Sequence, residues 1–178
     1  MALRNVILIV WGVFWLYWLI AAVSAKHGVR SHRFRVPGLL LIVAIALAHV
    51  FKPGTLAVHS PILQVLGIVL LLSGLGLAVW ARIYLGRNWG MPMTKKEEPE
   101  LVTSGPYRFV RHPIYSGLLL AVLGTALATN LYLLIALVVA GAYFIYSATV
   151  EERLLTEVFP TDYPSYKART KMLIPFVL

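Results

Sequence analysis

Long apolar segments constrain the fold of this chain more than any other feature of its sequence. Five can be marked, at residues 6–25, 37–51, 62–85, 114–128 and 131–150. A membrane-spanning helix needs about 20 apolar residues, within a range near 17–25. The first, third and fifth segments have this length, whereas the second and fourth are shorter. Because 60% of the 178 residues are hydrophobic, the sequence predicts a single all-α domain: an integral membrane bundle of five transmembrane helices, followed by a helical C-terminal tail.

The fourth and fifth segments are joined only by Thr129 and Asn130, which predicts a tight helical hairpin. The sequence leaves open whether this hairpin crosses the whole bilayer, since both of its ends return to the same side in either case. Gly117, Ala121 and Thr125 form a row of small residues on the fourth segment. Small residues at this spacing let membrane helices approach closely, so we expect the row to face another helix.

The basic residues predict the orientation in the membrane. If all five segments cross, every one of the 16 Lys and Arg residues except Arg4 and Lys52 lies on the same side. Positively charged loops stay in the cytoplasm, so we expect a multi-pass protein with its N-terminus outside and its C-terminus inside. The net charge of +9 then reflects cytoplasmic loops beside anionic lipid. We therefore expect the lipid bilayer to be the partner of these basic residues. We expect no binding of nucleic acid, and we infer no obligate protein partner.

The composition excludes several kinds of site. The chain has no cysteine, which rules out disulfides, thiolate metal sites and a Cys nucleophile. Its five His residues include no pair at positions i and i+4, so no metal site is predicted. Asp162 is the only Asp, which leaves a Ser–His–Asp arrangement without a candidate. No glycine-rich phosphate cradle follows a predicted strand.

Two polar clusters lie at the predicted cytoplasmic ends of the apolar segments. The first, GPYRFVRHPIYSG at residues 105–117, ends the longest polar loop and leads into the fourth segment. Pro113 favours the start of a helix and disfavours helix at His112. Residues 107–112 should therefore form a short rigid element at the N-terminus of the fourth helix, where the partial positive charge suits an anionic group. Ionisable residues at the membrane rim are candidates for function.

The second cluster begins with Glu151 and Glu152, which we expect to end the fifth helix. The helix dipole opposes negative charge at that end, so the carboxylates need Arg108, Arg111 or a bound cation as a partner. A salt bridge that closes the helical hairpin is the alternative to a binding site. Arg82, at the end of the third segment, can either extend to the membrane surface or take part in the site.

Residues 82–176 resemble the isoprenylcysteine carboxyl methyltransferase family, and the wider group of small integral-membrane methyltransferases that includes the phospholipid methyltransferases. The motifs that carry the resemblance are RIYLGRNWG at 82–90, GPYRFVRHPIYSG at 105–117 and EERLLTEVFPTDYPSYKARTKMLIP at 151–175, in this order. Residues 1–81, whose first two spans carry no part of this resemblance, are expected to supply the N-terminal spans of the single domain 1–178. Residues 82–178 then form the cofactor-binding and catalytic part, with residues 86–113 as a cytoplasmic catalytic loop.

The resemblance also implies an enzyme that transfers a methyl group from S-adenosylmethionine to a lipid-like acceptor, first of all the carboxylate of a prenylated, isoprenylcysteine-type substrate. Arg169, which would orient that carboxylate, and Arg82 are the implied catalytic residues. The implied cofactor-binding residues are Tyr107, Arg108, Arg111, His112, Pro113, Tyr115, Gly117, Glu151 and Glu152. The Glu carboxylates match the ammonium or ribose hydroxyls of the cofactor, and the helix N-terminus with Arg108 or His112 matches its carboxylate.

Other functions stay open from the sequence. The acceptor can instead be the amine head group of a phospholipid or a small thiol. An Arg-His-Pro-x-Tyr element also occurs in membrane sterol reductases, which makes an NADPH-dependent reductase an alternative, although Glu151 and Glu152 would repel the 2′-phosphate of that cofactor. A non-enzymatic membrane protein, whose polar clusters only set topology or mediate interactions, is a further alternative.

Overall fold

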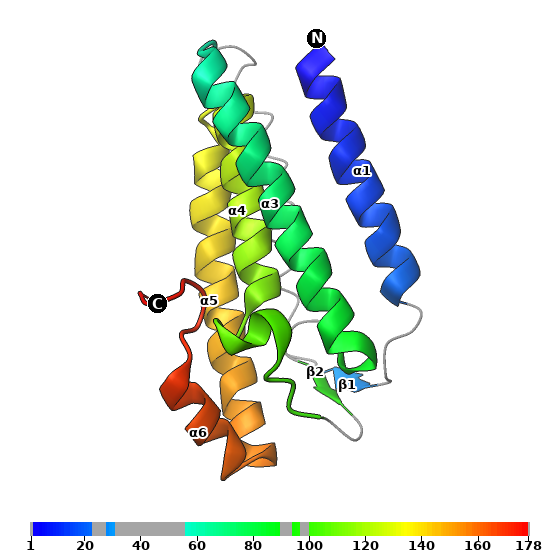
Figure 1. Ribbon diagram of the computed structural model, residues 1–178, viewed down its shortest axis with the longest axis vertical. Helices are drawn as coiled ribbons and strands as arrows, with labels where there is room; N and C mark the ends of the chain where they lie inside the picture. Colours follow the sequence, from blue (N-terminus) through cyan, green and yellow to red (C-terminus); the bar gives the residue numbers. More distant parts are fainter. Residues whose placement is uncertain (1, 23–27, 31–55, 90–93, 97–99, 178) are drawn as a thin grey trace.

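In the part of the chain that the structure describes, four long helices and a short C-terminal helix form the architecture (Figure 1). The computed structural model describes residues 2–22, 28–30, 56–89, 94–96 and 100–177. In chain order the elements are α1 (Ala2–Ala22), β1 (Gly28–Arg30), α3 (Pro61–Leu85), the 3-10 helix η1 (Gly86–Asn88), β2 (Thr94–Lys96), the 3-10 helix η2 (Gly105–Arg108), α4 (Pro113–Ala128), α5 (Leu133–Val158) and α6 (Asp162–Arg169). The predicted all-α class is confirmed, and the antiparallel pair of β1 and β2 is a small addition that the sequence did not predict.

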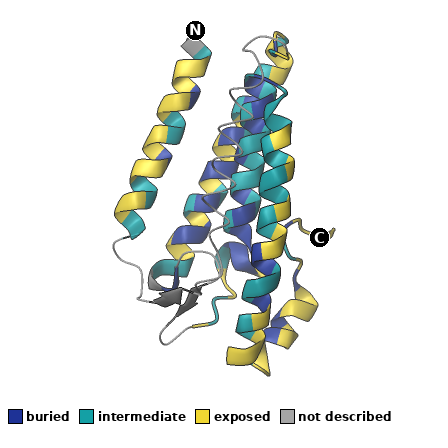
Figure 2. Cartoon of the chain, turned by 180° about the vertical axis from the view of Figure 1, so that it is seen from behind, coloured by how far each residue is buried: buried dark blue, intermediate teal, exposed yellow. Residues whose placement is uncertain are grey.

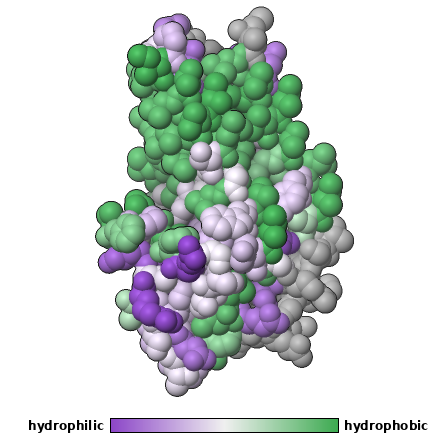
Figure 3. Space-filling view, in the orientation of Figure 1, coloured by the Kyte–Doolittle hydropathy of each residue, from purple (hydrophilic) through white to green (hydrophobic). Residues whose placement is uncertain are grey.

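Four of the five predicted apolar segments correspond to helices. α1, α3 and α5 are long and apolar enough to cross a membrane, and α4 is an apolar helix of 16 residues. The predicted segment at residues 37–51 lies outside the described residues. Exposed side chains on α1 and α3 are largely Leu, Ile and Val (Figure 2). Hydrophobic residues form a broad band across the upper half of the surface in Figure 3, with a few hydrophilic residues above it at the rim and more of them gathered at the lower end. Such a surface suits a lipid bilayer, so the chain is an integral membrane protein.

Backbone contact between α3 and α4 forms the centre of the bundle. A Cβ added at Gly74 would lie 2.5 Å from backbone atoms of Gly117 and Ala121. One added at Gly67 would lie 2.5 Å from the Gly124 carbonyl oxygen. Glycine lets the two backbones approach this closely, as is common between membrane helices. The expectation that Gly117 and Ala121 face another helix is therefore confirmed.

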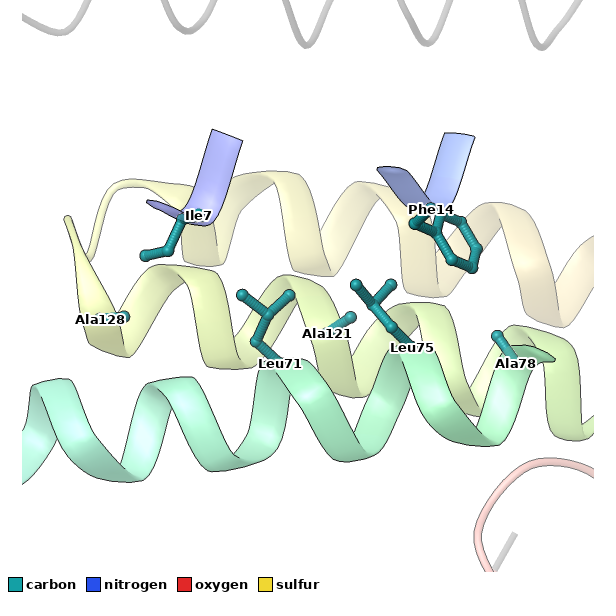
Figure 4. Packing of buried hydrophobic residues seen from close by; sticks show 7 residues of the cluster. All are labelled: Ile7, Phe14, Leu71, Leu75, Ala78, Ala121 and Ala128. Carbon is teal, nitrogen blue, oxygen red and sulfur yellow. The ribbon is translucent and has the colours of Figure 1, made fainter. Parts of the chain in front are cut away.

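α1 packs its inner face against α3 and α4. Ile7 and Phe14 are buried in a cluster with Leu71 of α3 (Figure 4). Thr125, the third member of the predicted row of small residues, contacts α1: the indole Nε1 of Trp11 donates a hydrogen bond to Thr125 Oγ1 at 3.1 Å. A hydrogen bond among apolar helices has little competition from water, so this contact ties α1 to α4.

The turn between α4 and α5 reaches the end of the bundle at which α3 begins. The amide of Val58 donates to the Thr129 carbonyl oxygen, and the amide of Leu131 donates to the Leu56 carbonyl oxygen, both at 3.0 Å. These bonds pair the turn with the segment just before α3. Since α3 is long enough to cross a membrane, the hairpin of α4 and α5 extends through the same depth, although the 16 residues of α4 alone span only about 24 Å.

The prediction that Glu151 and Glu152 end the fifth helix is wrong, because α5 continues to Val158. The apolar pattern stops at Val150, but the following residues, EERLLTEV, are mostly good helix formers. The helix therefore runs on for about two turns beyond its apolar part. The dipole acts mainly within the last turn of a helix, so it does not oppose the two carboxylates as expected.

The chain after α6 returns to the start of α4. Val110 and Lys171 form a parallel bridge. The amides of Arg111 and His112 donate to the carbonyl oxygens of Lys171 and Met172, at 2.8 and 3.0 Å. This pairing brings the motif before α4, the end of α5 and the C-terminal tail together at one end of the bundle, as the sequence predicted for the two polar clusters.

Candidate active site

A buried ion cluster lies where α4 begins. The side chain of Glu152 on α5 is only 4% exposed, and Arg111 Nε donates to its Oε1 at 2.6 Å. Lys167 Nζ lies 2.7 Å from Glu152 Oε2. A carboxylate at this depth needs such partners, because an unpaired buried charge is costly. The expectation that an Arg from the loop before α4 compensates the Glu pair is confirmed for Arg111.

The Arg111 guanidinium also holds the C-terminal tail. Its Nη1 donates to the carbonyl oxygen of Thr170 and, at 3.3 Å, to that of Lys167. Ser116 Oγ on α4 donates to the Leu173 carbonyl oxygen at 2.5 Å. Helix ends leave carbonyl groups without partners, and these donors satisfy carbonyls at and after the end of α6. The salt bridge that the sequence analysis weighed against a binding role is therefore present, and it docks the tail as well as closing the hairpin.

His112 lies between the two carboxylates. Its Nδ1 is 3.6 Å from Glu151 Oε2, and its Nε2 is 3.5 Å from Glu152 Oε1. Nε2 is buried and makes no hydrogen bond of good geometry with any described residue. Pro113 begins α4, as predicted, and the backbone of His112 has φ −125° and ψ 60°, outside the helix. The start of α4 thus presents a buried imidazole that faces both carboxylates.

Two hydroxyl groups and an aromatic stack orient Glu151. Tyr115 Oη donates to Glu151 Oε1 at 2.5 Å, and Ser147 Oγ donates to the same oxygen at 3.3 Å. The Tyr115 ring is stacked between the rings of His112 and Phe144, with centroid distances of 5.4 and 4.5 Å. The Glu151 side chain is 25% exposed. Of the two carboxylates, Glu151 is therefore the one that a ligand can reach.

Several predicted site residues lie away from this cluster, and Arg108, Arg169 and Gly117 are three of them. Arg108 is exposed, and its guanidinium carbon lies 4.5 Å from the centroid of the Phe109 ring. Arg169 is exposed at the end of α6, where its Nε donates to the Ser165 carbonyl oxygen at 3.2 Å. Gly117 packs against α3. The structure does not bring these three residues into the cluster, so their implied roles in binding and catalysis stay predictions.

Arg82 is buried where α1 and α3 end, apart from the Glu pair. Its Nη1 donates to the Gly86 carbonyl oxygen at 2.6 Å, and its Nη2 donates to the Ala21 carbonyl oxygen at 2.5 Å. The guanidinium also lies 4.8 Å from the centroid of the Trp89 ring, within cation–π range. Positive charge is favourable at helix C-termini, so Arg82 joins the ends of α1 and α3. A catalytic role for Arg82 stays a prediction.

Tyr107 is buried in η2 between these two regions. Its carbonyl oxygen accepts a hydrogen bond from Tyr166 Oη at 2.6 Å, which ties η2 to α6. Burial, together with the nearby Tyr166 and Glu151, raises the pKa of the Tyr107 phenol well above its ordinary value. The phenol is therefore neutral near pH 7 and is a hydrogen-bonding group rather than a phenolate base.

Four residues of the cluster were not predicted from the sequence. Ser147 and Phe144 lie one and two turns before Glu151 on α5, so the helical spacing was a usable signal for them. Lys167 and Ser116 gave no comparable signal. Lys167 of α6 contacts Glu152 of α5, and Ser116 of α4 contacts Leu173 of the tail. Both contacts exist only because α6 and the tail fold back onto the bundle, and the sequence pattern does not encode that return.

The charges of the cluster are balanced. Arg111 and Lys167 together offset the two negative charges of Glu151 and Glu152. The exposed part of Glu151 can accept hydrogen bonds from hydroxyl or ammonium groups. S-adenosylmethionine has these groups, so the residues present fit the cofactor that the family resemblance implies.

Comparison with known proteins places the chain in a family. The phospholipid methyltransferase family matches residues 62–162. The cobalt-zinc-cadmium resistance protein CzcN of Cupriavidus metallidurans is 30% identical over 80% of this chain and 62% of its own length. Protein-S-isoprenylcysteine O-methyltransferase B of Arabidopsis thaliana is 30% identical over 83% of this chain and 76% of its own length. The chain thus spans less than two thirds of the first of these relatives and about three quarters of the second.

A solved structure has the same fold. The eukaryotic intramembrane Ras methyltransferase ICMT, an isoprenylcysteine carboxyl methyltransferase, superposes with a TM-score of 0.61 at 23% identity, over 82% of this chain and 55% of the other. At this identity the likeness concerns the helical membrane fold. The resemblance to isoprenylcysteine carboxyl methyltransferases that the motifs indicated is confirmed by these matches, and the chain belongs to the phospholipid methyltransferase family of membrane proteins.

Proposed function

We propose that this protein transfers a methyl group from S-adenosylmethionine to a lipid-like acceptor at the membrane, and that the acceptor group is the carboxylate of an isoprenylcysteine-type substrate. The observation that carries the proposal is the charge-balanced cluster in which Arg111 and Lys167 offset Glu151 and Glu152 beside His112. It lies at one end of helices long enough to cross a membrane. Membership of a methyltransferase family favours this function over the reductase and the non-enzymatic alternatives.

The bound cofactor would supply an activated methyl group on its sulfonium. The protein's residues would hold the two reactants close together and away from water, which is the main requirement of such a transfer. Glu151 would bind the ammonium or ribose hydroxyls, and His112, whose Nδ1 lies 3.6 Å from Glu151 Oε2, would help to hold that carboxylate in place. A carboxylate acceptor is ionised at neutral pH, so it needs no general base. The buried phenol of Tyr107 is neutral and would be a poor base. This is compatible with the reaction, because no proton has to be removed.

We further propose that the cluster faces the cytoplasm. The end of the bundle that holds the cluster carries four basic residues, Arg111, Lys167, Arg169 and Lys171. Arg4 lies in the first turn of α1, at the opposite end (Figure 1). The positive-inside rule assigns the more basic end to the cytoplasm. An acceptor anchored in the bilayer by an apolar chain would then reach the cluster from the cytoplasmic leaflet.

The test is methyl transfer by the purified protein in lipid nanodiscs. Radiolabelled S-adenosylmethionine is supplied with a prenylcysteine carboxylate, a phospholipid amine or a small thiol. We expect label in the carboxylate as a base-labile ester, and a strong loss of transfer in Glu151→Gln. Glu157→Gln is the matched control, because Glu157 is exposed on the same helix. Label only in the amine or the thiol would overturn the acceptor assignment, and no label in any acceptor would overturn the proposed activity.

A further inference from the structure

Ser147 is a fully buried polar side chain on α5, with 0% exposure. Its Oγ lies 3.1 Å from Tyr115 Oη and 3.3 Å from Glu151 Oε1. Tyr115 Oη donates to that same carboxylate oxygen at 2.5 Å. Ser147 thus completes a triangle of oxygens with the Tyr of the motif that begins α4 and the first Glu of the pair on α5.

The hydrogen atoms of this triangle can be counted. The phenol of Tyr115 has one proton, and the short distance assigns it to Glu151 Oε1. Ser147 also has one proton, which can go to the phenol oxygen or to the carboxylate oxygen. In the first case Ser147 polarises the phenol, which strengthens its bond to Glu151, and in the second it donates to Glu151 itself. Ser147 stabilises the same orientation of the carboxylate in both cases.

The surroundings prevent the triangle from adjusting. The Tyr115 ring is stacked between His112 and Phe144 with interplanar angles of 5° and 9°, so its hydroxyl has a fixed place. Ser147 is held by the backbone of α5, one turn before Glu151. The Glu151 side chain is itself flexible and a quarter exposed. The two hydroxyl groups therefore help to set its orientation, beside His112 Nδ1 at 3.6 Å from Oε2, as functional groups generally depend on the shell that supports them.

We propose that Ser147 is a positioning residue for the methyl donor: it acts through Tyr115 and Glu151 and fixes the carboxylate in the orientation that binds the cofactor. The inference rests on the proposed function only for the identity of the ligand. The coupling between Ser147 and Glu151 is a property of the protein alone. Small displacements of a positioned group reduce binding and rate strongly, so loss of the hydroxyl should weaken cofactor binding without disrupting the fold.

A double-mutant cycle with Ser147→Ala and Glu151→Gln tests the proposal. Affinity for S-adenosylhomocysteine, the demethylated product, is measured by calorimetry, and thermal unfolding is measured without any ligand. Ser147→Ala should weaken affinity roughly three- to tenfold in the otherwise unchanged protein, and should change it little when Glu151 is already Gln. The Michaelis constant for S-adenosylmethionine should rise more than kcat falls. The midpoint of thermal unfolding should behave in the same way: the double variant should lose less than the sum of the losses in the two single variants.

Thr149→Ala is the matched control. Its hydroxyl also lies on α5, but it donates to the Ile145 carbonyl oxygen within the helix at 2.8 Å. We expect this variant to leave affinity unchanged. Additive effects of Ser147→Ala and Glu151→Gln on both affinity and unfolding would overturn the proposal. If the unchanged protein binds no S-adenosylhomocysteine, the proposed function fails, and the unfolding cycle still decides whether Ser147 acts through Glu151.

Discussion

Two cations contact Glu152 at nearly the same distance, yet we predict very different costs for their removal. Arg111 Nε and Lys167 Nζ lie 2.6 and 2.7 Å from its carboxylate oxygens. The Arg111 side chain is 8% exposed, whereas that of Lys167 is 51% exposed. Solvent screens an exposed pair, which is worth about 0–1 kcal/mol. Removal of one partner from a buried pair costs about 3–5 kcal/mol, because the other charge stays buried.

Arg111→Leu removes the buried ion pair and also the hydrogen bonds to the Lys167 and Thr170 carbonyl oxygens. For a chain of this size, 1 kcal/mol corresponds to roughly 2–4 °C in Tm. We therefore expect Arg111→Leu to lower Tm by about 6–20 °C. Lys167→Ala leaves Glu152 paired with Arg111 and should lower Tm by less than about 4 °C.

Far-UV circular dichroism of the detergent-purified protein measures both values. Limited proteolysis adds a local readout, since Arg111→Leu should make the tail after α6 the first site of cleavage. Arg153→Leu serves as a control, because Arg153 is an exposed basic residue on the same helix as Glu152. A fall in Tm for Lys167→Ala as large as that for Arg111→Leu would refute the argument that burial, rather than distance, sets the worth of each pair.

The remaining predictions concern helix packing, the acceptor and the orientation. Gly124→Ala should force α3 and α4 apart and lower the free energy of unfolding by about 1–3 kcal/mol, because a Cβ at this position meets the α3 backbone. Gly141→Ala is the control: its Cβ enters open space, so Tm should stay the same or rise. If Arg169 orients an acceptor carboxylate, Arg169→Lys should lose turnover but keep cofactor affinity; full turnover of both the Lys and the Gln variants would remove it from the mechanism. In this Cys-free chain, Ser165→Cys should react with an impermeant thiol reagent only from the cytoplasmic side and His59→Cys only from the outside; the reverse pattern would invert the topology.

Much of the fold could be predicted because the bilayer imposes simple length and polarity rules. The apolar segments matched α1, α3, α4 and α5, and the small residues Gly117 and Ala121 marked the contact of α4 with α3. The end of α5 was misplaced by about two turns because hydropathy reports where a helix leaves the apolar layer, not where the helix itself ends. Beyond Val150 only helix propensity remains as a signal, and it is weak.

The site was predictable as a set of motifs but not in its internal arrangement. The order of apolar and polar segments predicted that His112, Arg111 and the Glu pair lie at one end of the bundle. It could not tell which Glu is buried, because successive helical residues point about 100° apart and the burial of Glu152 depends on the tail that Arg111 docks. The contacts of Ser147 likewise depend on the three-dimensional approach of α4 to α5.

The central claim is that the cluster at the start of α4 binds S-adenosylmethionine through Glu151. Equilibrium binding of radiolabelled S-adenosylmethionine to the protein in nanodiscs, with NADPH as the alternative ligand, tests this most directly. We expect saturable binding of S-adenosylmethionine and none of NADPH. The affinity should fall about ten- to a hundredfold in Glu151→Gln, as for a lost hydrogen bond to a charged group, and stay unchanged in Glu157→Gln. Binding that is absent, or that is the same in all three proteins, would contradict the account.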